Sequence, residues 1–385
     1  MRPFRFLLVA GETSGDMYGA DVALALMAKF PGCQIFGLGG EKMLQAGVEL
    51  EGDIRHTAAM GPLAAFSQLG SLFKVFRRLA DRIEISPPDA AILIDFPDFN
   101  LRLAKRIKAV KVPIIYYISP QVWAWRESRV KQIKDLVSKM LVIFPFEERI
   151  YEKAGVPVEF VGHPLIETVR ATKTKEEFFR TYALDPNRPM LAILPGSRRK
   201  EIRRILPTLC DVVERIRSAK PDTQFVLPAA PNLDRGLIEE ILGNHPIRLL
   251  HGETYNVLRY SRAAIVASGT ATLEAALLGT PEVIVYRVSP IEAWFLDKFF
   301  LKVRLFGIVN IILGHEVVPE LFQDRFTPEL VTAAAMKLMD DVWLQSQIRA
   351  NYETLRRQLG GGKVAERVVS AVAEAINLEQ SRKKE

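Results

Sequence analysis

The sequence predicts an α/β protein made of two doubly wound domains in tandem. Short apolar runs alternate with helical patterns along most of the 385 residues, which is typical of parallel sheets covered by helices on both faces. The alternation stops at a charged segment that contains proline and then starts again, and the chain is long enough for two separate cores. We expect a first domain over residues 1–165, a linker over 166–189, a second domain over 190–345, and C-terminal helices with a basic tail over 346–385 that could pack back on the first domain.

Short apolar runs bounded by turn residues are the expected strands of both sheets. In the first domain they are Phe4–Val9, Gln34–Leu38, Ala90–Ile94, Pro113–Ile118, Met140–Phe144 and Val158–Val161. The helical patterns between them are Asp16–Lys29, Leu63–Ile83, Phe99–Lys108, Arg126–Leu136 and Phe146–Ala154. In the second domain the expected strands are Met190–Leu194, Gln224–Leu227, Ile247–Leu250, Ala263–Val266 and Glu282–Val285. Because strands and helices alternate regularly, both sheets are expected to be parallel.

The charge balance narrows the classes of partner. The formal net charge is +7 and the isoelectric point is near 9.3, which favours phosphorylated molecules or a membrane surface and is compatible with nucleic acid. A mildly basic protein with no polyanionic partner is the plain alternative. Cys33 and Cys210 lie far apart without any metal-binding spacing, so we expect a reducing, cytoplasmic setting. The run Phe6–Ala10 is too short for a signal peptide, and no run of about 20 apolar residues predicts a membrane span.

The stretch Ala263–Tyr286 reads as strand, turn, helix, turn and strand. The turn Ser268, Gly269 and Thr270 then lies at a helix N-terminus on the carboxyl side of a parallel sheet, where backbone N–H groups and the helix dipole favour an anion. Glu274, one helical turn further on, can reach the two hydroxyls of a ribose. These features predict a seat for a nucleotide diphosphate. An ordinary capped crossover helix is the alternative, and this stretch alone does not decide between the two.

A second turn of the same kind follows the first strand of the second domain. In Leu194–Lys200, Gly196 permits close backbone approach, Ser197 is a helix-capping residue, and Arg198 can bind a phosphate through its guanidinium. Together with the turn at Ser268, this places two helix N-termini in one domain where both can face one anion. The pair is more specific than either turn alone.

The first strand of the chain is followed by the residues Ala-Gly-Glu-Thr-Ser-Gly-Asp. Gly11 and Gly15 let the backbone turn closely, and Ser14 or Asp16 can cap the next helix. Glu12 is left at the mouth of the domain. The stretch lacks the Gly-x-Gly-x-x-Gly spacing, so it does not predict a dinucleotide site, and a tight strand-to-helix turn is the alternative interpretation.

A third turn offers a candidate general base. Asp95 closes the strand Ala90–Ile94 at its carboxyl end, where open α/β sheets bind ligands. Pro97 is placed to turn the chain and Asp98 to cap the helix that follows. Asp95 is therefore the better candidate for a base, although both acids could be turn residues. No cluster of acids or histidines nearby supports a metal site.

Two apolar stretches combine aromatic residues with Lys and Arg, as helices at a membrane surface do. In Met60–Phe76, large apolar residues recur at helical spacing. The expected membrane-contacting residues are Leu63, Phe66, Leu69, Phe73 and Phe76. The second stretch is Trp294–Leu305. A buried core helix is the alternative for both stretches and the favoured interpretation of the second.

A set of short stretches occurs in order along the chain: GETSGD, IDFPDFN, SPQVWAWR, LPGSR and SGTATLE. By this ordered set and its length, the sequence resembles the lipid-A-disaccharide synthases of Gram-negative bacteria, from Val9 to about Gly314. The resemblance implies an inverting glycosyltransferase of the GT-B type, with two Rossmann-like domains. It also implies sugar transfer without a metal or other cofactor, by a cytoplasmic enzyme peripheral on the inner face of the inner membrane.

The resemblance implies a donor, UDP-2,3-diacylglucosamine, and an acceptor, 2,3-diacylglucosamine 1-phosphate, joined through a β-1,6 bond with release of UDP. It implies that the UDP diphosphate binds at Ser268–Thr270 and Arg198, and that the ribose binds at Glu274. Asn310 matches an asparagine of the family's motif that binds substrate.

The acceptor is expected to bind on the first domain, against Gly11, Ser14 and Gly15. An inverting transfer needs a base opposite the leaving UDP, and Asp95, with Glu12 beside it, can take the proton of the acceptor 6-hydroxyl.

Two other classes of function remain open at this point. Another enzyme of the same architecture that acts on a UDP-sugar, such as a UDP-GlcNAc 2-epimerase, would share the UDP seat but has no use for the apolar face of Met60–Phe76. A nucleotide- or RNA-binding protein without catalysis would need a continuous Lys and Arg face with aromatic residues on a sheet. The charges here are spread and the aromatic residues follow helical spacing, so we expect no nucleic acid partner.

Overall fold

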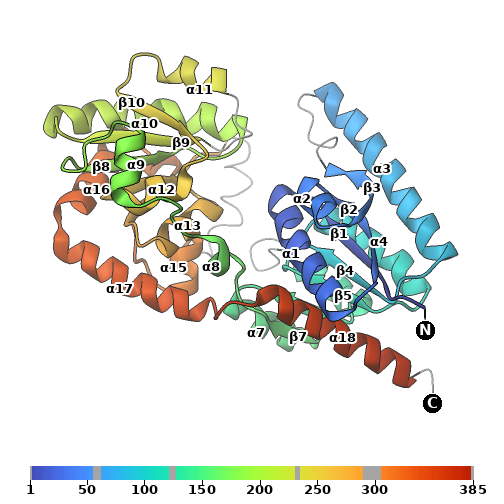
Figure 1. The fold of residues 1–385 in the computed structure, drawn as a ribbon. Coiled ribbons are helices and arrows are strands. Elements are labelled where there is room, and N and C mark those ends of the chain that lie inside the picture. The colour runs from blue at the N-terminus through green and yellow to red at the C-terminus, as the bar shows by residue number, and fades with distance from the viewer. Residues whose placement is uncertain (1, 55–61, 121–126, 230–234, 289–304, 383–385) are drawn as a thin grey trace. The chain divides into compact units, whose positions relative to one another are not determined.

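The computed structural model describes residues 2–54, 62–120, 127–229, 235–288 and 305–382 (Figure 1). The chain divides into two compact units, one formed by Met1–Pro164 with Leu359–Glu385 and the other by Leu165–Gln358. Each unit is built on its own parallel sheet, which confirms the expected α/β class with two doubly wound domains.

The sheet of the first unit has seven strands within the described residues, in the order β3-β2-β1-β4-β5-β6-β7. The strands are β1 (Arg5–Ala10), β2 (Gln34–Gly39), β3 (Glu49–Asp53), β4 (Ala90–Ile94), β5 (Ile114–Tyr117), β6 (Lys139–Val142) and β7 (Val158–Phe160). The strand order reverses between β1 and β4, which pair in parallel. From β1 the order runs outward to β2 and β3, and from β4 it runs outward in the other direction to β5, β6 and β7. Such a switch point is where open α/β sheets bind ligands.

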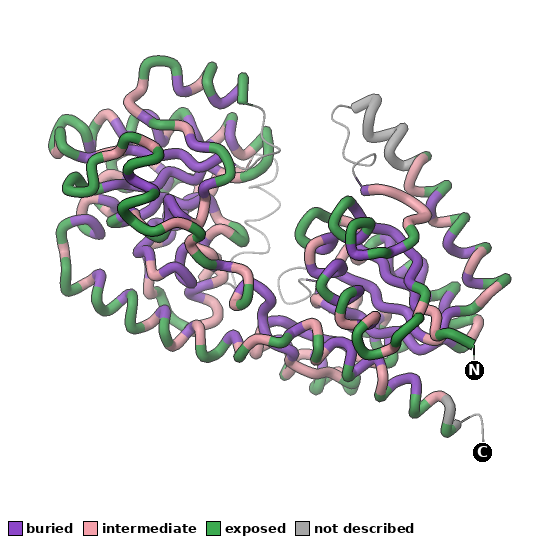
Figure 2. Tube along the Cα trace, viewed as in Figure 1, coloured by how far each residue is buried: buried purple, intermediate pink, exposed green. Residues whose placement is uncertain are grey.

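Helices cover both faces of this sheet. They are α1 (Thr13–Lys29), α2 (Glu41–Gln45), α3 (Pro62–Ile85), α4 (Pro97–Ala109), α6 (Glu127–Leu136), α7 (Pro145–Ala154) and α18 (Val364–Arg382). Successive residues of β1 point to opposite faces, so Phe6 and Leu8 pack with α1 and α18, whereas Leu7 and Val9 pack with α3 and α4. The inner strands β2, β1, β4, β5 and β6 are accordingly buried along most of their length, whereas the edge strands β3 and β7 are half-buried (Figure 2).

The second unit has a six-stranded sheet within the described residues, in the order β10-β9-β8-β11-β12-β13. The strands are β8 (Met190–Leu194), β9 (Gln224–Ala229), β10 (Ile247–His251), β11 (Ala263–Ala267), β12 (Glu282–Tyr286) and β13 (Glu320–Phe322). Its helices are α8 (Leu165–Thr168), α9 (Lys175–Thr181), α10 (Arg199–Ala219), α11 (Arg235–Leu242), α12 (Thr254–Tyr260), α13 (Thr270–Leu277), α15 (Ile308–Leu313), α16 (Pro328–Asp340) and α17 (Val342–Gln358), with the 3-10 helix η2 (Gln323–Arg325). The switch point of this sheet lies between β8 and β11.

The expected strands are found within a residue or two of their predicted ends. Two strands were not expected, β3 and β13, and both lie at an edge of their sheet. β3 reads Glu-Leu-Glu-Gly-Asp and β13 has three residues, so neither has the apolar run that marks a buried strand. Edge strands are covered less than central ones, which is why such sequences can occupy these positions.

The last helices of the chain belong to different units. α18 packs on α1 in the first unit, with Val368 and Val372 fully buried in the same cluster as Ala23 and Leu26. The expectation that the C-terminal helices pack back on the first domain is therefore confirmed for α18. α17 lies within the second unit, where it contacts α15 and α16.

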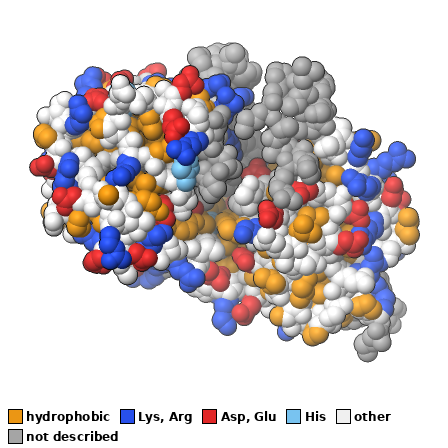
Figure 3. Space-filling model, turned by 45° about the horizontal axis from the view of Figure 1, so that its top comes forward, with side chains coloured by type: hydrophobic (Ala, Val, Ile, Leu, Met, Phe, Trp, Pro, Cys, Tyr) orange, Lys and Arg blue, Asp and Glu red, His pale blue; other side chains and the backbone are white. Residues whose placement is uncertain are grey.

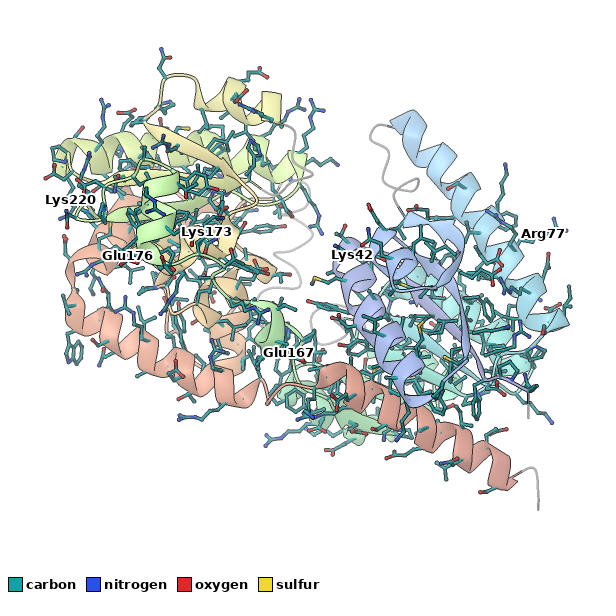
Figure 4. The ribbon with its side chains drawn as sticks, viewed as in Figure 1. Lys42, Arg77, Glu167, Lys173, Glu176 and Lys220 are labelled. Carbon is teal, nitrogen blue, oxygen red and sulfur yellow. The ribbon has the colours of Figure 1, made fainter. Side chains whose placement is uncertain are left out.

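The segment 166–189, expected as a linker, packs as part of the second unit. Phe178 and Phe179 of α9 are buried. Lys173, labelled in Figure 4, forms an ion pair with the buried Glu253, with 2.5 Å between Nζ and Oε1. The Tyr182 hydroxyl donates to the same carboxylate. The charged residues of this segment are thus used in local contacts, and its apolar residues extend the core.

Phe178→Ala tests whether this segment contributes to the core of the second unit. Because the Phe178 side chain is fully buried, its truncation should leave a cavity and lower the free energy of unfolding of this unit by about 3–5 kcal/mol. Urea unfolding followed by circular dichroism measures the change. Arg180→Ala, at an exposed position of the same helix, is the matched control and should cost less than about 0.5 kcal/mol. Equal stability of the two variants would mean that the segment is a linker.

Candidate active site

Two of the predicted turns meet at the switch point of the first sheet. Ala10 at the end of β1 lies opposite Ile94 at the end of β4. The residues that follow, Gly11 and Asp95, therefore leave the sheet at neighbouring positions of its carboxyl edge. The structure thus brings together the stretches that begin at Gly11 and at Asp95, which are far apart in the sequence.

The ring of Phe96 packs directly over Gly11. A Cβ atom on Gly11 would lie 2.1 Å from Cγ of Phe96, so no larger residue fits there while the ring keeps its place. The ring also stacks on Phe99, with 5.3 Å between ring centroids. Gly15 is buried, and a Cβ atom there would lie 3.3 Å from Cβ of Ala10, which lets α1 begin close to the strands. Both glycines therefore have a packing role, whatever they contribute to a ligand.

Asp95 has the properties of a base that works near neutral pH. Burial, together with the nearby negative charge of Glu12, raises the pKa of Asp95 to about 6, against a smaller opposing effect of the Phe96 N–H. Glu12 itself is exposed, at the N-cap position of α1, and its side chain does not cap the helix. Ser14 is exposed in the first turn of the same helix. A carboxyl group with this pKa is ionised above about pH 6, and in that form it can accept a proton.

The expected capping roles of two aspartates are wrong. The N-cap of α4 is Phe96, without a side-chain hydrogen bond, and Asp98 instead lies in the first turn, where it pairs with Arg129 at 2.6 Å. Asp16 does not cap α1. Its carboxylate accepts hydrogen bonds from three backbone N–H groups at the start of α2, those of Gly40, Lys42 and Met43. Each acid meets donors from a segment distant in sequence, which local capping rules cannot foresee.

The second unit places its two predicted turns at its own switch point. Leu194 in β8 lies opposite Val266 in β11, so the turns after these strands begin at the same edge of the sheet. In the turn after β11, Gly269 and Thr270 are exposed and Ser268 is half-buried. A Cβ atom on Gly269 would have no neighbour within 4 Å among the described atoms, so the described residues leave space beside this turn at the start of α13.

The turn after β8 differs from the prediction in its cap. Arg198, not Ser197, is the N-cap of α10, and the Glu201 carboxylate accepts hydrogen bonds from the backbone N–H groups of both residues. The Arg198 side chain is 73% exposed and contacts Glu201 at 3.1 Å. Gly196 has φ of +111°, a conformation that favours glycine. Arg198 is therefore placed at this edge with its guanidinium largely in solvent.

Glu274 lies one turn into α13 and is half-buried. Burial raises its pKa, against the opposing effect of a hydrogen bond from the Tyr255 hydroxyl, which lies 3.0 Å from Oε1. Tyr255 in α12 was not predicted as part of this site. The sequence around Tyr255 does not indicate this role, because the contact between Tyr255 and Glu274 depends on how α12 packs beside α13.

Asn310 in α15 is hydrogen-bonded within the second unit. Its side chain is fully buried, and its amide group donates to the Val318 carbonyl and to Glu320 Oε1. Its oxygen accepts from the backbone N–H groups of Val317 and Val318. These bonds use the donors and acceptors of the amide and fasten α15 to the segment before β13. Asn310 therefore has a structural role, and its expected contact with substrate stays a prediction.

The predicted membrane-contacting residues have different surroundings. Phe73 in α3 is 66% exposed. Phe76 is half-buried and packs edge-on against Phe99, with 5.7 Å between ring centroids, so part of its ring belongs to the core of the first unit. Its contact with a membrane stays a prediction. The side chains of Leu63, Phe66 and Leu69 lie outside the described residues, as do nearly all of Trp294–Leu305 and the Trp pair of SPQVWAWR.

Two searches over the described part of the chain have negative results. No helix there is long and apolar enough to cross a membrane. No group of three or more His, Cys, Asp or Glu side chains is arranged there to hold a metal ion.

Comparison with known proteins identifies the family. A model of the lipid-A-disaccharide synthetase family matches residues 6–375. The lipid-A-disaccharide synthase of Geobacter sulfurreducens is 41% identical to this chain, over 97% of either length. The enzyme of the same name from Koribacter versatilis is 42% identical with the same coverage.

Solved structures agree on the architecture. A UDP-GlcNAc 2-epimerase from Neisseria meningitidis bound to UDP-GlcNAc has a TM-score of 0.68 at 15% identity, covering 96% of this chain and 100% of its own. The glycotransferase of kitacinnamycin has a TM-score of 0.63 at 16% identity, covering 98% and 100%. At such identities the likeness shows the fold alone. By the family match and the identity to curated members, the chain belongs to the lipid-A-disaccharide synthase family, glycosyltransferases of lipid A biosynthesis with the GT-B fold.

Proposed function

We propose that this chain transfers the sugar of UDP-2,3-diacylglucosamine to 2,3-diacylglucosamine 1-phosphate, giving lipid A disaccharide 1-phosphate and UDP. Family membership supports the reaction class. The observation that carries the residue-level proposal is Asp95, a half-buried carboxylate at the switch point of the first sheet with its pKa raised to about 6. Such a group suits the removal of a proton from a sugar hydroxyl.

In the proposed reaction, the 6-hydroxyl oxygen of the acceptor forms a bond to the anomeric carbon of the donor while the bond from that carbon to UDP breaks. Asp95 takes the hydroxyl proton. Glu12 acts on Asp95 through its charge, which raises the affinity of the Asp95 carboxylate for that proton. The backbone of Gly11 and Gly15 and the hydroxyl of Ser14, at the start of α1, are the proposed contacts of the acceptor.

The proposed donor seat is the switch point of the second sheet. The diphosphate would lie on the N-terminus of α13 at Ser268–Thr270, where the described residues leave space beside Gly269 and the helix dipole favours negative charge. Arg198 would bind a phosphate oxygen, and Glu274, held by Tyr255, would accept the ribose hydroxyls. The helix dipole and Arg198 meet the charge that develops on the leaving UDP, so the proposal includes no metal and no other cofactor.

Other functions have weaker support. The UDP-GlcNAc 2-epimerases resemble this chain at the level of fold alone, whereas its family relatives share about two fifths of the residues. On the face drawn in Figure 3, Lys and Arg side chains alternate with Asp and Glu rather than forming one basic surface. That distribution does not favour nucleic acid as a partner.

We further propose that the enzyme works as a peripheral protein on the inner face of the inner membrane. Phe73 projects from α3 next to exposed Lys74, with Arg77 and Arg78 one turn further on. An exposed aromatic residue beside basic residues suits the boundary between acyl chains and anionic headgroups.

An assay of UDP release tests the function. We expect release from UDP-2,3-diacylglucosamine in the presence of EDTA when 2,3-diacylglucosamine 1-phosphate is added, and none without it. Asp95→Asn should lower kcat by about 10²–10⁴-fold, because the general base is lost, and leave UDP binding unchanged. Asp98→Asn, in the same stretch but 79% exposed, is the control and should retain most of the activity. Turnover near that of the original chain in Asp95→Asn would show that another group is the base.

The pH dependence should follow the protonation of Asp95. The base must be ionised to act, so kcat/KM should rise with pH through about pH 6 and then level off. In Glu12→Gln the neighbouring negative charge is gone, so the pKa of Asp95 falls and the rising limb moves to lower pH. Initial rates of the original chain and of Glu12→Gln between about pH 4.5 and 8.5, a range that includes the pKa of Asp95 at about 6, measure the rising limb of each profile. A limb that stays in place in Glu12→Gln would contradict the coupling, and loss of all activity would make Glu12 a candidate base.

Arg198→Ala tests the diphosphate seat. Loss of a charge-assisted hydrogen bond should raise the Kd of UDP by about 10–100-fold, measured by isothermal titration calorimetry. Arg203→Ala removes an exposed arginine further along α10 and should change the Kd little. The same Kd for both variants would place the diphosphate elsewhere.

Phe73→Glu tests the membrane proposal. Inserting a charge where an aromatic ring enters the lipid boundary should lower the fraction of protein that sediments with anionic phospholipid vesicles by about 10-fold. Ile85→Glu, at the far end of the same helix and also at an exposed apolar residue, is the control and should bind as the original chain does. Undiminished sedimentation of Phe73→Glu would refute a role of this face.

A further inference from the structure

The turn that carries Asp95 has an unusual backbone. Asp95 and Phe96 are consecutive residues with φ of +45° and +44°, in the left-handed region. Residues other than glycine avoid this region because Cβ comes too close to the following carbonyl oxygen, and a bulky residue such as Phe is rarely found there. A sequence of this kind adopts the left-handed turn only where surrounding contacts enforce it.

Two buried side chains supply such contacts from neighbouring elements. The Tyr116 hydroxyl, from β5, donates to the Asp95 carbonyl oxygen at 2.6 Å. The Asn100 amide, from α4, donates to the same oxygen at 2.8 Å and to the Ile94 carbonyl at 3.2 Å. Both side chains are fully buried. The peptide group after Asp95 is therefore held by two donors that converge on one atom.

Asn100 shows that this arrangement has a cost. Its side-chain oxygen is buried and has no hydrogen-bond partner within the described part of the chain. An unsatisfied buried acceptor is destabilising, so an apolar residue of similar size would suit the packing better. What Asn100 contributes is its two hydrogen bonds to the carbonyl oxygens of the turn, which an apolar residue could not make.

The other side of the turn is held by packing. The Phe96 ring fills the space above Gly11 and stacks on Phe99. The backbone N–H of Asp95 also donates to the Tyr117 carbonyl at 2.9 Å, which keeps the residue aligned with the end of the neighbouring strand. Between these contacts the main chain of Asp95 has little freedom, and the direction of its side chain follows from the main chain.

We propose that Tyr116 and Asn100 are positioning residues that hold the left-handed turn after β4 and so keep the Asp95 carboxylate where it meets the acceptor hydroxyl. The inference rests on the proposed role of Asp95 as the base. A base displaced by about 1 Å loses about 10²-fold in rate, so the two donors control activity without touching the substrate.

Tyr116→Phe is the sharpest test, because it removes one hydroxyl from a buried ring and leaves the ring volume in place. We expect kcat to fall by about 10–100-fold, with KM for the UDP-sugar and the Kd of UDP unchanged, since the UDP seat belongs to the other unit. A relaxed turn admits water to the carboxylate, which lowers the pKa of Asp95, so the acidic limb of the kcat profile should move to lower pH. A merely structural loss would lower stability without moving this limb.

Tyr151→Phe is the matched control. It also removes a buried tyrosine hydroxyl from the first unit, one that lies 2.8 Å from Ser119 Oγ and does not bond the Asp95 turn. This variant should keep its kcat and its pH profile. Equal losses in Tyr151→Phe and Tyr116→Phe, or a kcat and pH profile of Tyr116→Phe like those of the original chain, would overturn the inference.

Asn100→Leu and Asp95→Asn complete the set. Asn100→Leu removes the second donor and should lower kcat in the same way where the protein folds, as judged by circular dichroism; if it does not fold, Tyr116→Phe alone decides. Asp95→Asn separates the two possible failures. Full activity of Asp95→Asn refutes the proposed base, whereas its inactivity beside a fully active Tyr116→Phe refutes the positioning role alone.

Discussion

Burial of both faces of each parallel sheet is the constraint on which the rest of the structure depends. The central strands are apolar along their length, and in the first unit separate clusters of buried residues cover the two sides of the sheet. Side chains on these faces are committed to packing, so polar groups can meet a ligand only where strands end. In each unit the strand order reverses beside the first strand, β1 in one and β8 in the other. The turns that follow β1, β4, β8 and β11 are therefore the places open to chemistry.

The two edges differ in their electrostatic character. At the first, Asp95 is partly withdrawn from water and lies near the negative charge of Glu12, so the pKa of its carboxyl group is raised and it binds a proton more readily than an ordinary carboxylate. At the second, the N-terminus of α13 and the side chain of Arg198 at the start of α10 both favour an anion. A glycosyl transfer from a nucleotide requires a proton acceptor and a stabilised leaving diphosphate. The family match supports this reaction. We assign the proton acceptor to the first edge and the stabilisation of the leaving diphosphate to the second.

The first edge combines stabilising and destabilising features. Consecutive left-handed residues and an unsatisfied buried amide oxygen oppose folding locally. They persist because Tyr116 and Asn100 bond the same carbonyl and because the Phe96 ring packs on Gly11. Elsewhere in the unit, buried polar groups serve packing, as when Asp16 gathers three backbone N–H groups at the start of α2. Two consecutive left-handed residues and an unsatisfied buried oxygen thus lie beside the carboxylate to which we assign the chemistry.

The sequence by itself determined the α/β class, most of the strands, and the position of Asp95 and of the Ser268 turn at strand ends, because each of these follows from apolar runs and turn residues that are local in the chain. Only the tertiary structure decided which turns are neighbours, since that depends on strand order and register. It also decided that Asp98 pairs with Arg129 and that the hydrogen bonds of Asn310 are used within the fold. Edge strands and the packed segment 166–189 escaped prediction for the same reason. The burial, the pKa and the hydrogen-bond partners of a side chain depend on residues that are distant in the sequence and come close to it only when the chain folds.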